Sequence, residues 1–162
     1  VVVCVQSDAI GDGSFEAFLD TVESALHDAA LAHARLTYVE ALPGVDYRGF
    51  EALTARGIEF SRFVPFSDFW TEPFRISPGQ FWITTRFHHH LVAASHGARG
   101  FALVDPGQYY TTKHESLIEL GSGWLSARPG HNVPSVADTR GQSGFDKAYA
   151  RKRAEAESLY GS

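Results

Sequence analysis

The stretch from Thr84 to Asp105, TTRFHHHLVAASHGARGFALVD, concentrates residues that can do chemistry. Arg86 offers a planar guanidinium that can bind a carboxylate or a phosphate through two parallel hydrogen bonds. His88 follows two residues later and can donate a hydrogen bond to the same anion or move a proton near neutral pH. The two side chains predict an anion site. The alternative is an arginine paired with a local aspartate, beside a histidine that starts a helix.

The three consecutive histidines, His88 to His90, could suggest a metal site, but helix geometry argues against one. Successive side chains on a helix point about 100° apart, so three neighbours cannot bind a single ion. No glutamate joins a pair of histidines at the spacing of a zinc protease. We therefore expect no metal and no cofactor, and we expect His89 and His90 to pack against the sheet or to lie in solvent.

A lysine further along the chain is the second candidate cation. Lys113 lies in YYTTKHESL, in the first turn of an expected helix, where a positive charge opposes the helix dipole. Anion binding would explain this placement, and the alternative is a solvated lysine. Near the start of the chain, Gly11 and Gly13 form a loose Gly-x-Gly. Glu16 stands where a dinucleotide fingerprint needs its third glycine, so we expect no dinucleotide site.

Strand-like and helix-like segments alternate along the chain. Strands are expected at residues 1–6, 36–42, 58–64, 80–85 and 100–105. Helices are expected from residue 14 and over residues 46–57, 88–97, 112–121 and 145–160. This alternation predicts an α/β fold, a Rossmann-like doubly wound parallel sheet with right-handed crossovers.

In a doubly wound sheet, ligands bind at the carboxyl ends of the strands, near the point where the strand order reverses. The segments that leave the expected strands are Gln6 to Asp8, Thr84 to Arg86, and Asp105 to Tyr110. The rule therefore selects Gln6, Arg86 and Tyr110 as candidate binding residues. His88 and Lys113 follow in the helices that leave the same edge.

Length and composition fit one globular domain. The chain has 162 residues, of which 44% are hydrophobic and 20% charged. Its net charge of -5 argues against nucleic acid as the main partner. No apolar run reaches the roughly 20 residues of a transmembrane helix. The single cysteine, Cys4, lies in an apolar run and excludes a disulfide framework, which fits a reducing compartment such as the cytoplasm.

The segment Trp82–Gly121, WITTRFHHHLVAASHGARGFALVDPGQYYTTKHESLIELG, resembles the C-terminal signature of the polysaccharide pyruvyl transferase family. That signature is an apolar strand ending in Arg-x-His, a helix of small residues and a second apolar strand. An aromatic residue and a lysine then precede a helix ending in Leu-Gly. Here the signature residues are Arg86, His88, Tyr110 and Lys113, with LVAASHG, FALV and IELG as its helices and strand.

Members of this family resemble GT-B glycosyltransferases, in which two Rossmann-like domains face each other across a cleft. The resemblance implies that residues 1–121 form the C-terminal, donor-binding domain of such a fold. Residues 122–144 would be a long connection, and residues 145–162 a terminal helix that returns toward an N-terminal domain missing from this chain. We expect a cytoplasmic enzyme without a transmembrane segment, and we expect the isolated chain to be inactive.

The resemblance also implies a reaction, the transfer of the pyruvyl group of phosphoenolpyruvate onto a sugar of a cell-surface polysaccharide or exopolysaccharide as a ketal. Arg86 would clamp one anionic group of the donor, and Lys113 would bind the phosphate. His88 would be the catalytic residue that hydrogen-bonds the phosphate or moves a proton. Gln6 and Tyr110 would add contacts to the substrate. The partners would be phosphoenolpyruvate, a glycan acceptor and the missing domain.

Two other functions stay open at this point. A nucleotide-sugar glycosyltransferase domain would share the fold and bind a different donor. A non-catalytic α/β binding domain would keep the fold and lose the chemistry. The family often has a basic residue where the first strand of this domain ends, whereas this chain has Gln6, Ser7 and Asp8, and that difference favours the non-catalytic alternative.

Overall fold

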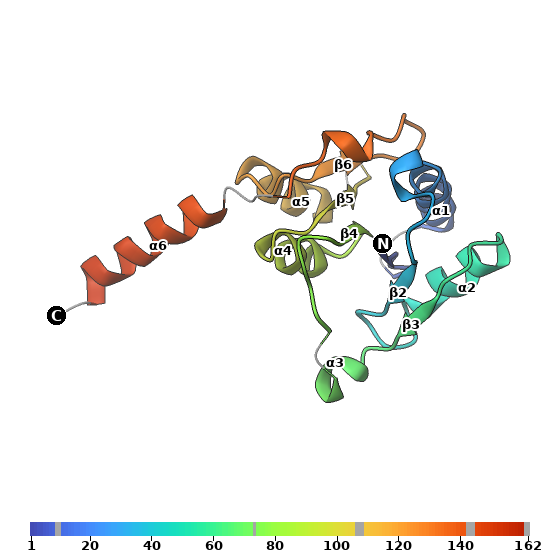
Figure 1. Cartoon of the computed structure of the whole chain (residues 1–162), viewed down its shortest axis with the longest axis horizontal. Helices are drawn as coiled ribbons and strands as arrows, with labels where there is room; N and C mark the ends of the chain where they lie inside the picture. The colour runs from blue at the N-terminus through green and yellow to red at the C-terminus, as the bar shows by residue number, and fades with distance from the viewer. Residues whose placement is uncertain (9–10, 73, 106–108, 142–144, 161–162) are drawn as a thin grey trace.

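A parallel six-stranded sheet forms the centre of the protein. The computed structural model describes residues 1–8, 11–72, 74–105, 109–141 and 145–160. The strand order is β3-β2-β1-β4-β5-β6 (Figure 1). The strands are β1 (Val2–Cys4), β2 (Thr37–Val39), β3 (Arg62–Val64), β4 (Phe81–Thr84), β5 (Arg99–Leu103) and β6 (Leu125–Ala127). All neighbouring strands run parallel, so the predicted α/β, Rossmann-like doubly wound sheet is confirmed.

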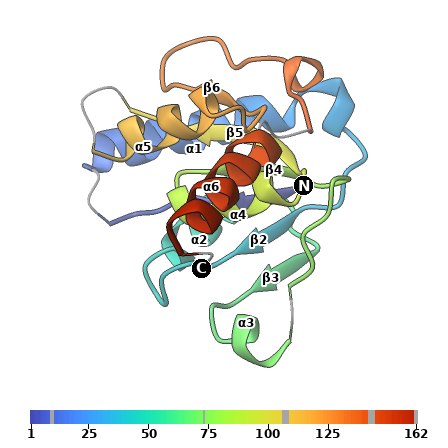
Figure 2. The ribbon, with the colours of Figure 1, turned by 90° about the vertical axis from the view of Figure 1, so that its left-hand side faces the viewer.

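Helices cover the sheet on both sides. They are α1 (Asp12–Leu26), α2 (Tyr47–Ala55), α3 (Asp68–Thr71), α4 (Phe87–Ser95), α5 (Tyr109–Glu119) and α6 (Phe145–Tyr160). Helices α1 and α2 pack together on one side, and α4 and α5 pack together on the other (Figures 1 and 2). The reversal of strand order between β1 and β4 separates the two pairs, as a doubly wound topology requires.

Each face of the sheet has its own hydrophobic core. Neighbouring residues of a strand point to opposite faces. Val3 belongs to the core that contains Phe15 and Leu19 of α1, whereas Val2 belongs to the core that contains Ala93 of α4. Because both faces are buried, the first strand is a continuous apolar run instead of an alternating one.

The sixth strand lies inside the segment that the sequence predicted as a connection, residues 122–144. It is only three residues long, Leu-Ser-Ala, and pairs with β5 at Phe101. Trp124 anchors it, because its ring is buried and its Nε1 donates to the carbonyl oxygen of Ala98 at 2.7 Å. So short a strand has no periodicity of its own, and its position depends on the edge of β5 and on this buried ring.

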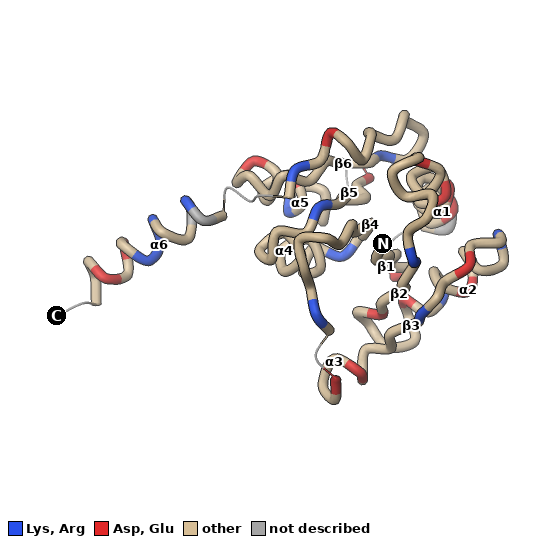
Figure 3. Tube along the Cα trace, viewed as in Figure 1, with Lys and Arg blue, Asp and Glu red and all other residues tan. Residues whose placement is uncertain are grey.

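Helix α6 projects away from the rest of the protein (Figure 1). Both basic and acidic residues lie along it (Figure 3). Lys152 Nζ lies 3.0 Å from Glu155, and Arg153 Nε lies 2.8 Å from Glu157. These pairs make α6 a surface helix that carries salt bridges between its own residues. In the described part of the chain, no helix combines the length and the apolar character needed to cross a bilayer.

Candidate functional site

The carboxyl ends of β1 and β4 meet at the point where the strand order reverses, which is where α/β sheets bind ligands. The backbone N–H of Thr85 donates to the carbonyl oxygen of Cys4 at 3.1 Å. The backbone N–H of Gln6 donates to Oγ1 of Thr85 at 2.7 Å. These bonds extend the pairing of the two strands beyond their ends. They hold the segments that carry Gln6 and Arg86 side by side.

Arg86 is the residue that precedes the first turn of α4, and its side chain is held by two carboxylates. Its Nε donates to Oδ2 of Asp46 at 3.2 Å, and its Nη2 donates to the other oxygen of the same carboxylate. Nη2 also donates to Oδ1 of Asp8 at 2.6 Å. Pairing with aspartate was the alternative that the sequence left open for Arg86. The partners come from 40 and 78 residues earlier in the chain.

The two carboxylates differ in how firmly they are placed. The side chain of Asp46 is fully buried and also accepts hydrogen bonds from the backbone N–H groups of Ala41 and Leu42, each at 2.9 Å. The side chain of Asp8 is 38% exposed. Asp46 is therefore a fixed structural partner of Arg86, whereas Asp8 can turn into solvent at little cost. In the described residues, Nη1 of Arg86 donates to no acceptor.

Lys113 lies at the same edge of the sheet as Arg86. Its Nζ lies 5.5 Å from the centre of the Phe87 ring and 5.3 Å from the centre of the Tyr110 ring. Phe87 directly follows Arg86 in the chain. Both distances are within the range of a cation–π contact. The ammonium is thus tied to the start of α4, although it belongs to α5.

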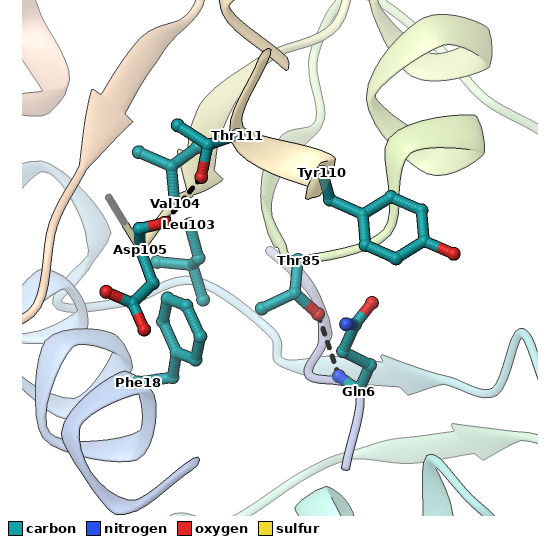
Figure 4. Close-up of a pocket in the computed structure, with 8 residues that line it drawn as sticks. All are labelled: Gln6, Phe18, Thr85, Leu103, Val104, Asp105, Tyr110 and Thr111. Atoms are coloured by element: carbon teal, nitrogen blue, oxygen red, sulfur yellow. Dashed lines mark hydrogen bonds between the residues drawn. The ribbon is translucent and has the colours of Figure 1, made fainter. Parts of the chain in front are cut away.

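Gln6 and Tyr110 line a small hollow between the carboxyl ends of β1, β4 and β5 (Figure 4). The remaining lining residues are Phe18, Thr85, Leu103, Val104, Asp105 and Thr111. Oγ1 of Thr111 donates to the carbonyl oxygen of Asp105 at 2.6 Å. The Asp105 carboxylate accepts from the Ser14 hydroxyl at 2.9 Å, which ties the start of α1 to the end of β5.

Arg86 and His88 line a second, larger groove on the side of α3. Its volume is about 560 Å³, within the range of small-molecule sites. Most of its wall is apolar and includes the aromatic rings of Phe66, Phe69, Phe74 and Trp82. His88 is exposed at this groove. The structure thus places Arg86 and His88 on one opening, Gln6 and Tyr110 on another, and Lys113 beside Phe87 and Tyr110.

His89 and His90, the other two histidines of the triplet, are less exposed than His88. Burial lowers the pKa of His89 to about 4, assisted by the positive charge of Arg86. His90 is fully buried, and burial followed by the nearby His114 lowers its pKa to about 3. His89 packs edge-on against Trp82, with ring centres 5.5 Å apart. Of the two placements expected for these histidines, against the sheet or in solvent, the structure shows His89 against Trp82 of β4 and His90 buried against Trp124.

A buried chain of hydrogen bonds connects His90 to α5. His114 Nε2 lies 3.0 Å from the carbonyl oxygen of Thr85, so this nitrogen carries the proton. His114 Nδ1 must then accept from Nδ1 of His90, 3.0 Å away, and Nε2 of His90 must accept from the Ser122 hydroxyl, also at 3.0 Å. Two neutral histidines satisfy the whole chain. It joins α4, α5 and the segment before β6 to the carbonyl oxygen of Thr85, the residue before Arg86.

Sequence reasoning missed Asp46 and His114. Asp46 follows a Pro-Gly turn and precedes a helix, so it reads as a surface turn residue, and its burial has no local signal. His114 sits beside Lys113 and gave no sign of a partner on another helix. Cys4 is buried as expected, and burial, followed by the charge of Asp46, raises the pKa of its thiol well above the usual value. The thiol therefore stays protonated and is no nucleophile.

Across the residues that the structure describes, no group of three or more histidine, cysteine, aspartate or glutamate side chains could hold a metal ion. The carboxyl edge carries the cations Arg86 and Lys113, the imidazole of His88, the amide of Gln6, and the carboxylates of Asp8, Asp46 and Asp105. Comparison of the chain with known protein families, with curated proteins and with solved structures found no match.

Proposed function

We propose that this chain is the donor-binding domain of a polysaccharide pyruvyl transferase, which moves the pyruvyl group of phosphoenolpyruvate onto a sugar of a cell-surface polysaccharide or exopolysaccharide. The observation that carries the proposal is that Arg86 stands at the start of α4, while the ammonium of Lys113, from α5, lies 5.5 Å from the ring of the next residue, Phe87. A ligand with two anionic groups needs two such cations. The resemblance of Trp82–Gly121 to the family signature supports the same donor.

The start of α4 adds to the attraction for an anion. Among the described residues, no side chain caps this helix end, so the backbone N–H groups of its first turn can donate to a ligand. Nη1 of Arg86 offers two further N–H donors. The partly exposed Asp8 carboxylate accepts from Nη2 of Arg86 at 2.6 Å, as a ligand carboxylate would. The donor therefore binds Arg86 by displacing Asp8, while Asp46 keeps the guanidinium in place.

The reaction would then use the groups at this edge. A proton adds to the methylene carbon of phosphoenolpyruvate, and the neighbouring carbon becomes oxocarbenium-like. Two hydroxyls of the sugar attack that carbon in turn, and inorganic phosphate leaves with the pair of electrons of its C–O bond. One hydroxyl proton replaces the proton used on the methylene carbon, and the other leaves with phosphate. His88 would move a proton, a role that contributes about 10²- to 10⁴-fold, and Lys113 would stabilise the departing phosphate.

Binding of phosphoenolpyruvate to the full chain, measured by calorimetry and by ³¹P NMR, tests the proposal. We expect millimolar or tighter binding that Lys113→Gln weakens by at least ~10-fold, about 1.4 kcal/mol, through loss of one charge. Arg86→Ala should abolish binding. Arg56→Ala is the matched control, because Arg56 pairs with Glu16 and Asp20 on the surface of α1.

The outcome that removes the proposal is an absence of binding at millimolar phosphoenolpyruvate in the folded wild-type chain. Arg86→Ala leaves the buried carboxylate of Asp46 without its cation and can unfold the chain. Lys113 is only partly buried, whereas Arg86→Ala uncovers a fully buried carboxylate, so Lys113→Gln decides the question if Arg86→Ala fails to fold. Circular dichroism and thermal melting establish folding for each variant.

A second candidate function is supported by the groove beside Arg86. Its aromatic wall of Phe66, Phe69, Phe74 and Trp82 suits a flat ring such as a nucleobase, and Arg86 lies at its edge. A nucleotide-sugar glycosyltransferase domain would use these features. A thermal shift with a panel of nucleotide sugars separates the two functions. Stabilisation by a nucleotide sugar without stabilisation by phosphoenolpyruvate would favour this second function.

A further inference from the structure

A buried amide at the end of β1 has an unused hydrogen-bond acceptor. Gln6 is only 3% exposed, and its Nε2 donates to the carbonyl oxygen of Asp8 at 3.4 Å. Its Oε1 is buried, yet none of the described residues donates to it. Exchanging the two ends of the amide would place Oε1 against the Asp8 carbonyl, which is also an acceptor. The oxygen is therefore the end without a partner.

The unpartnered amide belongs to the small hollow between β1, β4 and β5. The Gln6 side chain lies in this hollow between Thr85 and Tyr110 (Figure 4). The hollow has a volume of about 10 Å³, which is the space for one water-sized group. Buried polar atoms in proteins are almost always hydrogen-bonded, so an open acceptor of this kind marks a place where a ligand or a water completes the structure.

The chemistry of the hollow selects the group that fits. An acceptor oxygen needs a donor, which excludes the carboxylate or phosphate of an anion. Phe18, Leu103 and Val104 supply apolar walls, which disfavour a charged ammonium. A neutral hydroxyl has a donor, the right size and no charge. We propose that the hollow is a hydroxyl-binding site in which Oε1 of Gln6 accepts a hydrogen bond from one hydroxyl of a sugar.

Two lining residues connect the hollow to the cations of the donor site. Thr85 lines it and directly precedes Arg86, and Tyr110 lines it while its ring lies 5.3 Å from the ammonium of Lys113. Fully ionised phosphoenolpyruvate has only acceptors, so the hydroxyl must come from the second substrate. This assignment to the sugar acceptor rests on the proposed function. Gln6 would then be a binding residue that orients one acceptor hydroxyl beside the donor.

Sugar binding to the full chain tests the inference. The probes are methyl pyranosides of the glucose, galactose and mannose series, followed by saturation-transfer NMR with and without phosphoenolpyruvate. Gln6→Met keeps the length of the side chain and removes Oε1. We expect it to weaken sugar binding by at least ~5-fold, about 1 kcal/mol for one hydrogen bond, and to leave the dissociation constant of phosphoenolpyruvate within about 2-fold.

Gln80→Met is the matched control. Gln80 stands before β4, at the opposite end of the sheet, where its amide bonds the carbonyl of Arg75 and Nε1 of Trp82. Gln80→Met should therefore leave the sugar affinity unchanged. Circular dichroism checks the folding of both variants.

Three results would overturn the inference. They are equal sugar affinity in the wild type and Gln6→Met, no sugar binding by the wild type, and a crystal structure of the sugar complex in which Oε1 binds water only. That crystal structure decides the matter if Gln6→Met fails to fold. If Gln6-dependent sugar binding persists while phosphoenolpyruvate does not bind, the hydroxyl site stands and the proposed function falls.

Discussion

Replacing Asp8 by asparagine separates the two roles of the carboxylates around Arg86. Asp8→Asn keeps the size of the side chain and removes its charge. In the wild type, Oδ1 of Asp8 lies 2.6 Å from Nη2 of Arg86, and under the proposed function it competes with the anionic donor for the guanidinium. We expect the variant to bind phosphoenolpyruvate more tightly than the wild type, because the ligand no longer has to displace a carboxylate of its own charge.

The size of the gain follows from two contributions. An exposed ion pair is worth about 0.5–1 kcal/mol, and the side chain of Asp8 is 38% exposed, so displacing it costs no more than this. A displaced carboxylate that stays about 4 Å from the ligand repels it by about 1 kcal/mol in water. The sum is about 1–2 kcal/mol, or roughly 5- to 30-fold in the dissociation constant. Screening predicts a smaller gain in high salt.

Isothermal titration with phosphoenolpyruvate at low and high salt measures this gain. Asp20→Asn is the matched control, because Asp20 is an exposed carboxylate of α1 paired with Arg56, which directly follows α2, and its loss changes the net charge equally. Affinity that is unchanged or weaker in Asp8→Asn would refute the displacement of Asp8. An equal gain of affinity in Asp20→Asn would show that the effect comes from the net charge of the chain and not from the site.

Two further predictions concern stability. Asp46→Asn should lower the free energy of unfolding by about 3 kcal/mol, because it removes the fully buried partner of Arg86, whereas Asp8→Asn should change it by about 1 kcal/mol or less. Urea unfolding measures both, and equal losses would contradict the distinction. The chain should also lose stability as the pH falls below about 6.5, by roughly 1 kcal/mol per pH unit for each buried histidine. Burial lowers the pKa of His90 to about 3 and lowers that of His114, so below 6.5 the unfolded chain binds more protons than the folded one. Urea midpoints that stay constant between pH 7 and pH 5 would show that these histidines are not held neutral.

The order of elements could be predicted because each of its signals is local. The run Val1–Gln6 is apolar throughout, as a strand buried on both faces must be. Pro-Gly and Gly residues end several segments. The edge strand β6 could not be predicted in the same way, because three residues carry no period and Trp124 reaches its partner Ala98 only in the folded chain.

The charged residues around the candidate site also could not be predicted from local sequence patterns. The sequence places Arg86 after a strand and leaves its partner undecided between a ligand and an aspartate. The structure brings Asp46 and Asp8 to the guanidinium from loops that follow other strands. The histidine triplet also could not be assigned from the sequence. His90 is hydrogen-bonded to His114 on the next helix, whereas His88 is exposed.

The sequence by itself determined the fold class and the edge of the sheet at which Gln6, Arg86 and Lys113 would lie, because alternating strands and helices bring all strand exits of a parallel sheet to one side. Only the tertiary structure decided which carboxylates surround Arg86 and which acceptor of Gln6 stays open. Such pairings depend on strand order and on helix placement between residues far apart in the chain. The spacing of hydrophobic residues along the sequence gives no information about either strand order or helix placement.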